Sequence, residues 1–103
     1  MSRRQKKKAE KIRRAKLHRI LDQVLDINGL EVRTKSETGD KPTAFFWFNG
    51  NTGVTDIIVH YTGWDLGSKP DFTNRVAAHP KKWHNSLDDV IKQLDYIRGR
   101  YRV

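Results

Sequence analysis

The net positive charge of this chain is concentrated at its start. Residues 1–19 contain ten basic residues and one acid, Glu10, which gives this segment a net charge of +9. The whole chain of 103 residues, the size of one small domain, also carries +9, because residues 20–103 hold eleven basic and eleven acidic residues. Unpaired charges are costly to bury, so the core has to form from the neutral remainder, while the basic segment meets solvent or a polyanion.

Residues 9–27 have the composition of a helix that continues out of the basic segment. Ala, Glu, Lys, Arg, Leu and Gln dominate, and neither Gly nor Pro occurs before Gly29. Apolar residues recur at spacings of three and four, which predicts a buried stripe: Leu17, Ile20, Leu21, Val24 and Leu25, extended by Ile12. We therefore predict two parts, a basic arm over residues 1–16, either helical or ordered by a partner, and a compact domain over residues 17–103.

Three segments have the pattern of β-strands. Residues 30–36 alternate apolar and polar side chains, and residues 43–48 (TAFFWF) and 54–61 flank a strong turn signal, which predicts an antiparallel pair. Apolar residues on both faces of TAFFWF indicate a central strand covered twice, or one face left for a ligand. We expect Phe46 and Phe48 to pack in the core.

The end of the chain predicts irregular structure followed by a second helix. Residues 62–72 are rich in Gly and Pro, and residues 73–84 have the pattern of either one helical turn or a short edge strand. Ser86 and Asp89 have the spacing of a capping box, and the helix that follows has an apolar stripe: Leu87, Val90, Ile91, Leu94 and Ile97. The expected order is helix, three strands, helix, an α+β fold with a three-stranded antiparallel sheet.

The basic arm is also the strongest functional signal. Its cations surround the helical wheel, which suits salt-dependent contacts with the phosphates of a nucleic acid. The predicted phosphate-binding residues are Arg3, Arg4, Lys6, Lys7, Lys8, Lys11, Arg13 and Arg14. We favour RNA over DNA, either free or in a ribonucleoprotein complex. A solvated tail, an acidic protein partner and a mitochondrial presequence are alternatives; a membrane partner is not expected, because residues 3–11 have no large apolar side chains.

Two further groups form a secondary candidate surface for nucleic acid. Lys81, Lys82 and Trp83 lie just before the last helix, and Arg98, Arg100 and Arg102 lie at its end. The aromatic residues of TAFFWF are candidates for base stacking, with core packing as the alternative.

No catalytic residues, metal site or cofactor are predicted. The chain has no Cys, no G-x-S-x-G, no H-E-x-x-H and no Gly-rich phosphate loop. A nuclease would have to use Asp56 with Asp65 or Asp71, and zinc would have to use His60, His79, His84 and Asp88, which no spacing brings together. We therefore expect a non-enzymatic protein, and a cysteine-free chain without an apolar span suits the cytoplasm.

Two resemblances follow from this layout. The element order is similar to that of the double-stranded RNA-binding domain, but that family has a Lys-rich start to its last helix, where this chain has NSLDD. The basic RRQKKKAEKIRRAK, the junction LDQVLDINGLEV and the closing SLDDVIKQLDYI together resemble small phage-encoded anti-CRISPR proteins that inhibit Cas9-type effectors. That resemblance implies an arm that engages a guide-RNA-loaded effector and blocks its assembly, DNA access or cleavage without catalysis.

Overall fold

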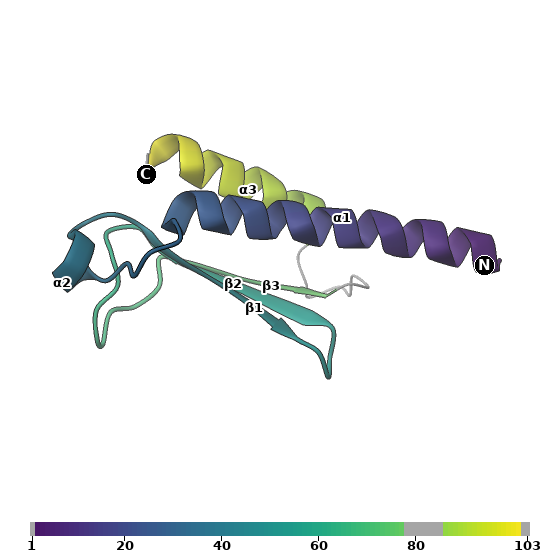
Figure 1. The fold of residues 1–103 in the computed structure, drawn as a ribbon, viewed down its shortest axis with the longest axis horizontal. Coiled ribbons are helices and arrows are strands. Elements are labelled where there is room, and N and C mark those ends of the chain that lie inside the picture. The colour runs from purple at the N-terminus through teal and green to yellow at the C-terminus, as the bar shows by residue number, and fades with distance from the viewer. Residues whose placement is uncertain (1, 78–85, 102–103) are drawn as a thin grey trace.

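The computed structural model describes residues 2–77 and 86–101. In chain order the elements are α1 (Arg3–Asn28), α2 (Lys35–Thr38), β1 (Thr43–Asn49), β2 (Val54–His60), β3 (Phe72–Ala77) and α3 (Leu87–Arg100). The strands form one antiparallel sheet in the order β1-β2-β3, and α1 and α3 lie together on one face of it (Figure 1). This is the α+β layout that the sequence predicts.

Helix α1 begins at Arg3 rather than at residue 9, because Ser2 caps it. The Ser2 hydroxyl accepts a 3.2 Å hydrogen bond from the Gln5 amide, and the Gln5 side chain accepts a 3.0 Å bond from the Ser2 amide. The helix ends at Asn28 and is capped by Gly29, whose φ of 77° is favourable for glycine. With 26 residues α1 is about 39 Å long. The basic arm is therefore helical from Arg3 onward, and its helix continues unbroken into the half that packs on the body.

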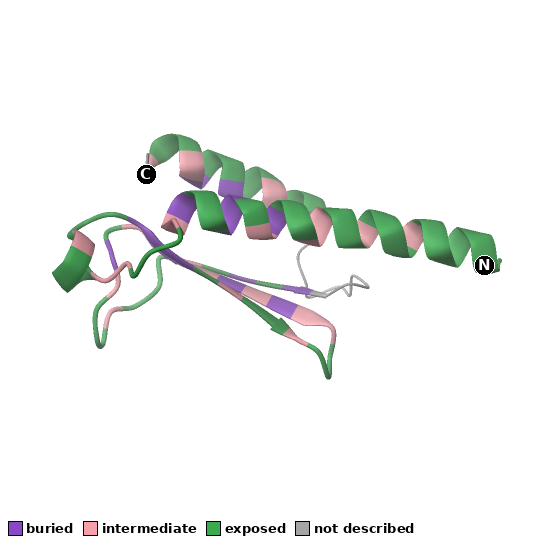
Figure 2. Ribbon diagram, viewed as in Figure 1, coloured by how far each residue is buried: buried purple, intermediate pink, exposed green. Residues whose placement is uncertain are grey.

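The core lies between α3, the second half of α1 and the inner face of the sheet (Figure 2). In α3 the predicted stripe is confirmed: Leu87, Val90, Leu94 and Ile97 are buried, and Ile91 packs against them. In α1 the buried residues are Ile20, Gln23, Val24 and Ile27, whereas the predicted members Leu25 and Ile12 are 38% and 47% exposed. The buried line is rotated because α1 packs against α3 as well as against the sheet.

A buried polar contact joins the two helices. The Gln23 side chain is fully buried, and its amide nitrogen donates to the Ile91 carbonyl oxygen at 2.9 Å and to Asp95 Oδ1 at 2.8 Å. Apolar periodicity does not include a glutamine in a core stripe, so this residue was missed. Its two bonds fix the position of α1 along α3.

The predicted first strand, residues 30–36, is wrong. Leu30 and Val32 are 87% and 73% exposed, and α2 begins at Lys35. This segment is instead held as irregular chain, because the Arg33 guanidinium donates to the carbonyl oxygens of Ile27 at 2.8 Å and of Pro42 at 3.1 Å. A short alternation without a turn to a neighbouring strand is weak grounds for a strand. The third strand is β3. Of the two alternatives predicted for residues 73–84, a helical turn or a short edge strand, the structure therefore has the edge strand.

None of the helices over residues 2–77 and 86–101 combines the length and the apolar character that crossing a membrane requires.

Candidate nucleic-acid interface

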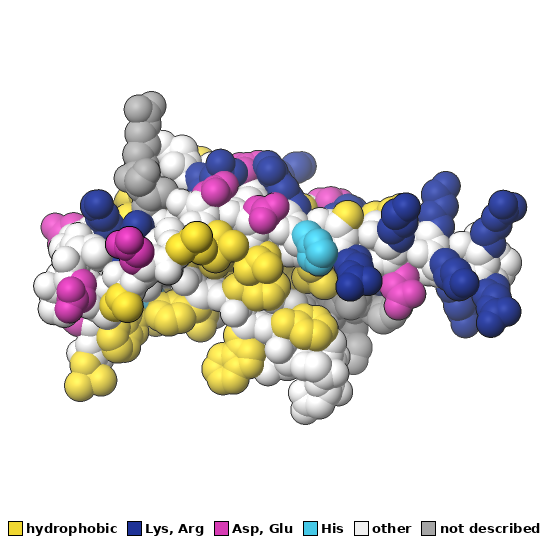
Figure 3. Space-filling view, viewed as in Figure 1, with side chains coloured by type: hydrophobic (Ala, Val, Ile, Leu, Met, Phe, Trp, Pro, Cys, Tyr) yellow, Lys and Arg dark blue, Asp and Glu magenta, His cyan; other side chains and the backbone are white. Residues whose placement is uncertain are grey.

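The cations of α1 form two groups, which differ in whether the fold uses them. Lys16 Nζ lies 3.1 Å from Asp88, and an Arg19 guanidinium nitrogen lies 3.6 Å from Asp95, so both cations tie α1 to α3. Earlier in α1, eight cations form no ion pair with any carboxylate that the structure describes, and all but Arg13 are exposed: Arg3, Arg4, Lys6, Lys7, Lys8, Lys11, Arg13 and Arg14. They gather at the N-terminal end of the molecule (Figure 3).

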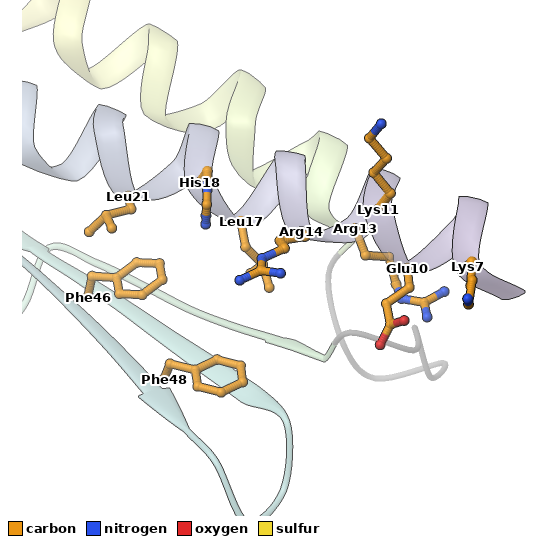
Figure 4. Close-up of a pocket in the computed structure, with 10 residues that line it drawn as sticks. All are labelled: Lys7, Glu10, Lys11, Arg13, Arg14, Leu17, His18, Leu21, Phe46 and Phe48. Carbon is orange, nitrogen blue, oxygen red and sulfur yellow. The ribbon is translucent and has the colours of Figure 1, made fainter.

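A groove of about 860 Å³ lies between this basic part of α1 and the inner face of β1. Its described lining combines cations and apolar side chains: Lys7, Glu10, Lys11, Arg13, Arg14, Leu17, His18, Leu21, Phe46 and Phe48. In Figure 4, Leu17 and Arg14 extend from α1 toward the side of the two phenylalanine rings, whereas Lys11 points away from them. The groove therefore has a basic wall on the helix and an aromatic wall on the strand.

The groove is open because α1 presents charged residues where a larger core would need apolar ones. Leu17 packs against the core, but the lining one and two turns earlier consists of Arg14 and Glu10. Phe46 is partly buried and packs on the core, as predicted. Phe48 is 49% exposed, so its predicted core position is wrong. Its ring is half open to any ligand in the groove.

The outer face of the sheet carries a second set of aromatic rings. Strand β1 is an edge strand, so the prediction of a central strand covered twice is wrong. Phe45 and Trp47 are 41% and 68% exposed, and they alternate along β1 with Phe46 and Phe48, which face α1, so they lie on the opposite face of the sheet. The His60 ring packs edge-on against Phe45, with 5.9 Å between centroids, and Arg75 pairs with Asp56 at 3.0 Å. This face offers rings, and Arg75, the cation that the described strand residues place there, is already paired.

Of the predicted secondary surface, Arg98 and Arg100 lie within the described residues, at the end of the molecule opposite to the arm (Figure 1). Arg98 pairs with Asp26 at 3.1 Å and with Asp95 at 3.3 Å, so it joins α1 and α3. Arg100 donates a 2.9 Å hydrogen bond to the Tyr96 hydroxyl, which raises the pKa of its guanidinium, and lies 5.7 Å from the Tyr101 ring centre. Lys81, Lys82, Trp83 and Arg102 lie outside the described residues.

The residues considered for catalysis and for metal binding are engaged separately. Asp56 pairs with Arg75, and Asp71 accepts a 2.7 Å hydrogen bond from the Tyr61 amide. The His60 ring lies 3.2 Å from the Ser68 hydroxyl. No group of three or more His, Asp or Glu side chains suited to a metal ion occurs in the described part of the chain, and His79 and His84 lie outside it.

The sequence does not predict the groove, although it does place the residues of each wall on one side of their own helix or strand. Arg14, His18 and Leu21 recur at i, i+4 and i+7, which places them on one side of a helix, and Phe46 and Phe48 share a strand face. Which helix turn faces which strand residue depends on the angle at which α1 leaves the sheet. No local pattern encodes that angle.

Comparisons with protein-family models, with curated proteins and with solved structures gave no match. They neither support nor contradict the resemblance to anti-CRISPR proteins. The chemistry of the interface is the remaining ground for a functional proposal.

Proposed function

We propose that this protein is a non-enzymatic nucleic-acid-binding protein that holds phosphates with the unpaired cations of α1. The observation that carries this proposal is the division of the helix. Lys16 and Arg19 form ion pairs with acids of α3, whereas the eight cations before them have no described acidic partner. A polyanion is the partner that satisfies many adjacent cations at once, through release of the counterions condensed on it.

The electrostatics of the arm helix favour this proposal over a solvated tail. Like charges repel at the i, i+4 spacing, as between Arg3 and Lys7 or between Arg4 and Lys8. The first turn contains no acid, so the cations also oppose the positive end of the helix dipole. A tail that only aids solubility gains nothing from such a helix. Phosphates along the helix would remove both penalties.

RNA remains our favoured nucleic acid, and the cytoplasm remains the compartment that we propose. A cysteine-free chain suits a reducing environment such as the cytoplasm. We assign the phosphate contacts to the arm and not to Arg98, because the guanidinium of Arg98 is already shared between two carboxylates.

A ribonucleoprotein partner is the second candidate, with inhibition of a guide-RNA-loaded effector as its special case. The observation that favours it is the exposed outer face of the sheet, where Phe45 and Trp47 offer apolar surface to a protein. In that case the arm would hold the RNA and the sheet would hold the protein. Trp47→Ala would then weaken binding to the complex but leave binding to free RNA unchanged.

The test of the main proposal is a fourfold charge variant of the arm with Lys6, Lys7, Lys8 and Lys11 changed to Gln. We expect its affinity for a single-stranded or duplex oligonucleotide to fall by at least about 100-fold at low salt, because several phosphate contacts are lost. Its melting temperature should stay unchanged, since none of these side chains has a described ion pair.

The matched control removes the same charge from the body, with Lys35, Lys41, Lys69 and Lys92 changed to Gln. All four side chains are exposed, as those of the arm are. An equal loss of affinity in both variants would show that net charge alone is responsible and would reject the arm as the site.

A further inference from the structure

We propose that the groove between α1 and β1 selects single-stranded nucleic acid, with an unpaired base on the Phe48 ring and the neighbouring phosphates on Arg14 and His18. This inference rests on the proposed nucleic-acid binding and adds the class of strand that is bound. It starts from the chemistry of the two walls. A single strand presents phosphates along one side and base faces along the other, and the groove presents cations on the helix and aromatic rings on the strand.

The ring of Phe48 is free to stack. It lies on the inner face of the sheet, yet it is 49% exposed and outside the core. Its neighbour on the same face, Phe46, is partly buried and packs on the core, so Phe46 forms the closed end of the aromatic wall. An aromatic ring open to solvent beside unpaired cations is the arrangement that single-strand binders use for stacking bases.

The charge of the groove also suits a phosphate backbone. Arg14 is exposed and has no described ion pair, and His18 lies one turn further along the same side of α1. Glu10 is the acid among the described lining residues, and Lys7, Arg13 and Arg14 lie at i−3, i+3 and i+4 from it on the helix. The lining therefore keeps a net positive charge.

The geometry distinguishes this groove from the outer face of the sheet, where Phe45 and Trp47 are also exposed. The cations that the structure places beside these rings are engaged, because Arg75 is held by Asp56 at 3.0 Å and Arg33 donates to two backbone carbonyls. In the groove, by contrast, aromatic rings and cations without a described ion pair line the same cavity.

A duplex does not fit this arrangement, because its bases are paired and stacked on one another and their faces are closed to the Phe48 ring. The groove volume of about 860 Å³ lies within the range of sites that enclose small ligands, about 300–1,000 Å³. It therefore holds a short stretch of the strand, and the remainder follows the basic side of α1.

The experiment compares Phe48→Leu with Trp47→Leu in the full chain. The two residues are adjacent in β1 and both are exposed aromatic side chains, but they lie on opposite faces of the sheet and only Phe48 is among the described residues that line the groove. Binding is measured by fluorescence anisotropy with labelled RNA and DNA strands of about twelve nucleotides and with duplexes of the same sequence. Thermal melting of each variant confirms that it is folded.

We expect Phe48→Leu to weaken single-strand binding about tenfold, the loss of one stacked base, and to leave duplex binding unchanged. Trp47→Leu should change neither. The wild type should prefer single strands to duplexes. RNA and DNA strands that bind equally would show that the groove reads the base and the phosphate, which both share, and a preference for RNA would add a contact to the 2′-hydroxyl.

A second readout separates stacking from charge. Phe48→Leu should leave the slope of log Kd against log salt unchanged, whereas Arg14→Gln should lower that slope by about 0.7, the value for one lost phosphate contact on a single strand. Equal effects of Phe48→Leu and Trp47→Leu, or a wild type that prefers duplex, would overturn the groove inference while nucleic-acid binding stood. A wild type that binds neither form would reject the proposed function itself.

Discussion

Lys16 Nζ lies 3.1 Å from Asp88, and this ion pair marks the place along α1 where the fold begins to use the cations of the helix. Two further charges in this half of α1 pair with opposite charges of α3: Arg19 pairs with Asp95, and Asp26 pairs with Arg98. Before Lys16 the helix carries eight cations without a described partner. One continuous helix therefore joins a part that stabilises the domain to a part that is available for a polyanion.

The contact between Gln23 and Asp95 predicts that removing Asp95 lowers the free energy of unfolding more than removing Asp88, another acid of α3. Asp95→Ala should lower the free energy of unfolding by about 1–3 kcal/mol, because it leaves the buried Gln23 amide without one of its two acceptors and also removes the exposed ion pairs with Arg19 and Arg98. Asp88→Ala removes an exposed ion pair and should cost under about 1 kcal/mol. Urea denaturation of both variants measures the difference, and equal costs would contradict the role given to Gln23.

The stacked rings of Tyr61 and Tyr101 predict a loss of stability in alkali. Their centroids lie 4.5 Å apart, and burial, followed by the neighbouring Tyr101 and Asp71, raises the pKa of the Tyr61 hydroxyl above its ordinary 10.0. An acid with a raised pKa in the folded state ionises first in the unfolded chain. The stabilisation is therefore complete below pH 10 and is lost as the pH rises through the folded-state pKa.

The corresponding measurement is the melting temperature of the wild type and of Tyr61→Phe at a series of pH values from neutral to strongly alkaline. The variant should lose less stability than the wild type above the ordinary tyrosine pKa, since it has no hydroxyl to ionise at this position. Parallel curves would show that Tyr61 does not contribute.

The position of Gly63 predicts that the loop after β2 does not tolerate a side chain there without a loss of stability. Its φ is +96°, and a side-chain carbon there would lie 2.6 Å from the Gly39 carbonyl oxygen, so Gly63→Ala combines a strained backbone with a clash. Gly67 has a similar φ of +88° but open space around it, so Gly67→Ala shows the backbone strain alone, about 1 kcal/mol. Chemical denaturation should show the larger loss for Gly63→Ala, and an equal loss would exclude the clash.

The arm helix predicts opposite effects of one substitution on helicity and on binding. Arg4→Glu places an acid in the first turn, where the helix dipole favours it, and opposite Lys7 and Lys8. Helicity by far-UV circular dichroism should rise, and affinity for an oligonucleotide should fall several-fold. Lys69→Glu, the same charge change on the body, is the control and should alter neither. An affinity that is retained in Arg4→Glu would exclude this end of α1 from the interface.

The elements with a clear local pattern were predictable from the sequence. The α3 stripe, the β1–β2 hairpin and the alternating faces of β1 all follow from periods of 3.6 and 2, and each is present in the structure. The start of α1 was predicted late, since composition alone did not reveal the capping box at Ser2. The strand predicted at residues 30–36 is wrong, and the pattern of residues 73–84 does not distinguish a helical turn from the edge strand β3. Both follow from the same cause, because a strand depends on the neighbour with which it pairs.

The candidate site was predictable only in its basic half. Charge counting identifies the cations of the arm, because charges that cannot be buried are visible in the sequence. The exposure of Phe48 was not predictable. It depends on where α1 diverges from the sheet, which is decided by how Ile20, Val24 and Ile27 pack in the core with residues far along the chain.

The most direct measurement is the affinity for a single-stranded oligonucleotide over a range of salt concentrations, for the wild type and for the fourfold arm variant. If α1 holds four or more phosphates, log Kd should rise linearly with log salt with a slope of about 3 or more for the wild type. The slope should fall by about 2.8 once Lys6, Lys7, Lys8 and Lys11 are neutral, about 0.7 for each lost contact, and the slope that remains reports the phosphates held by the other cations of α1. A wild-type affinity that does not depend on salt, or the same slope in both proteins, would contradict the assignment of phosphate binding to α1.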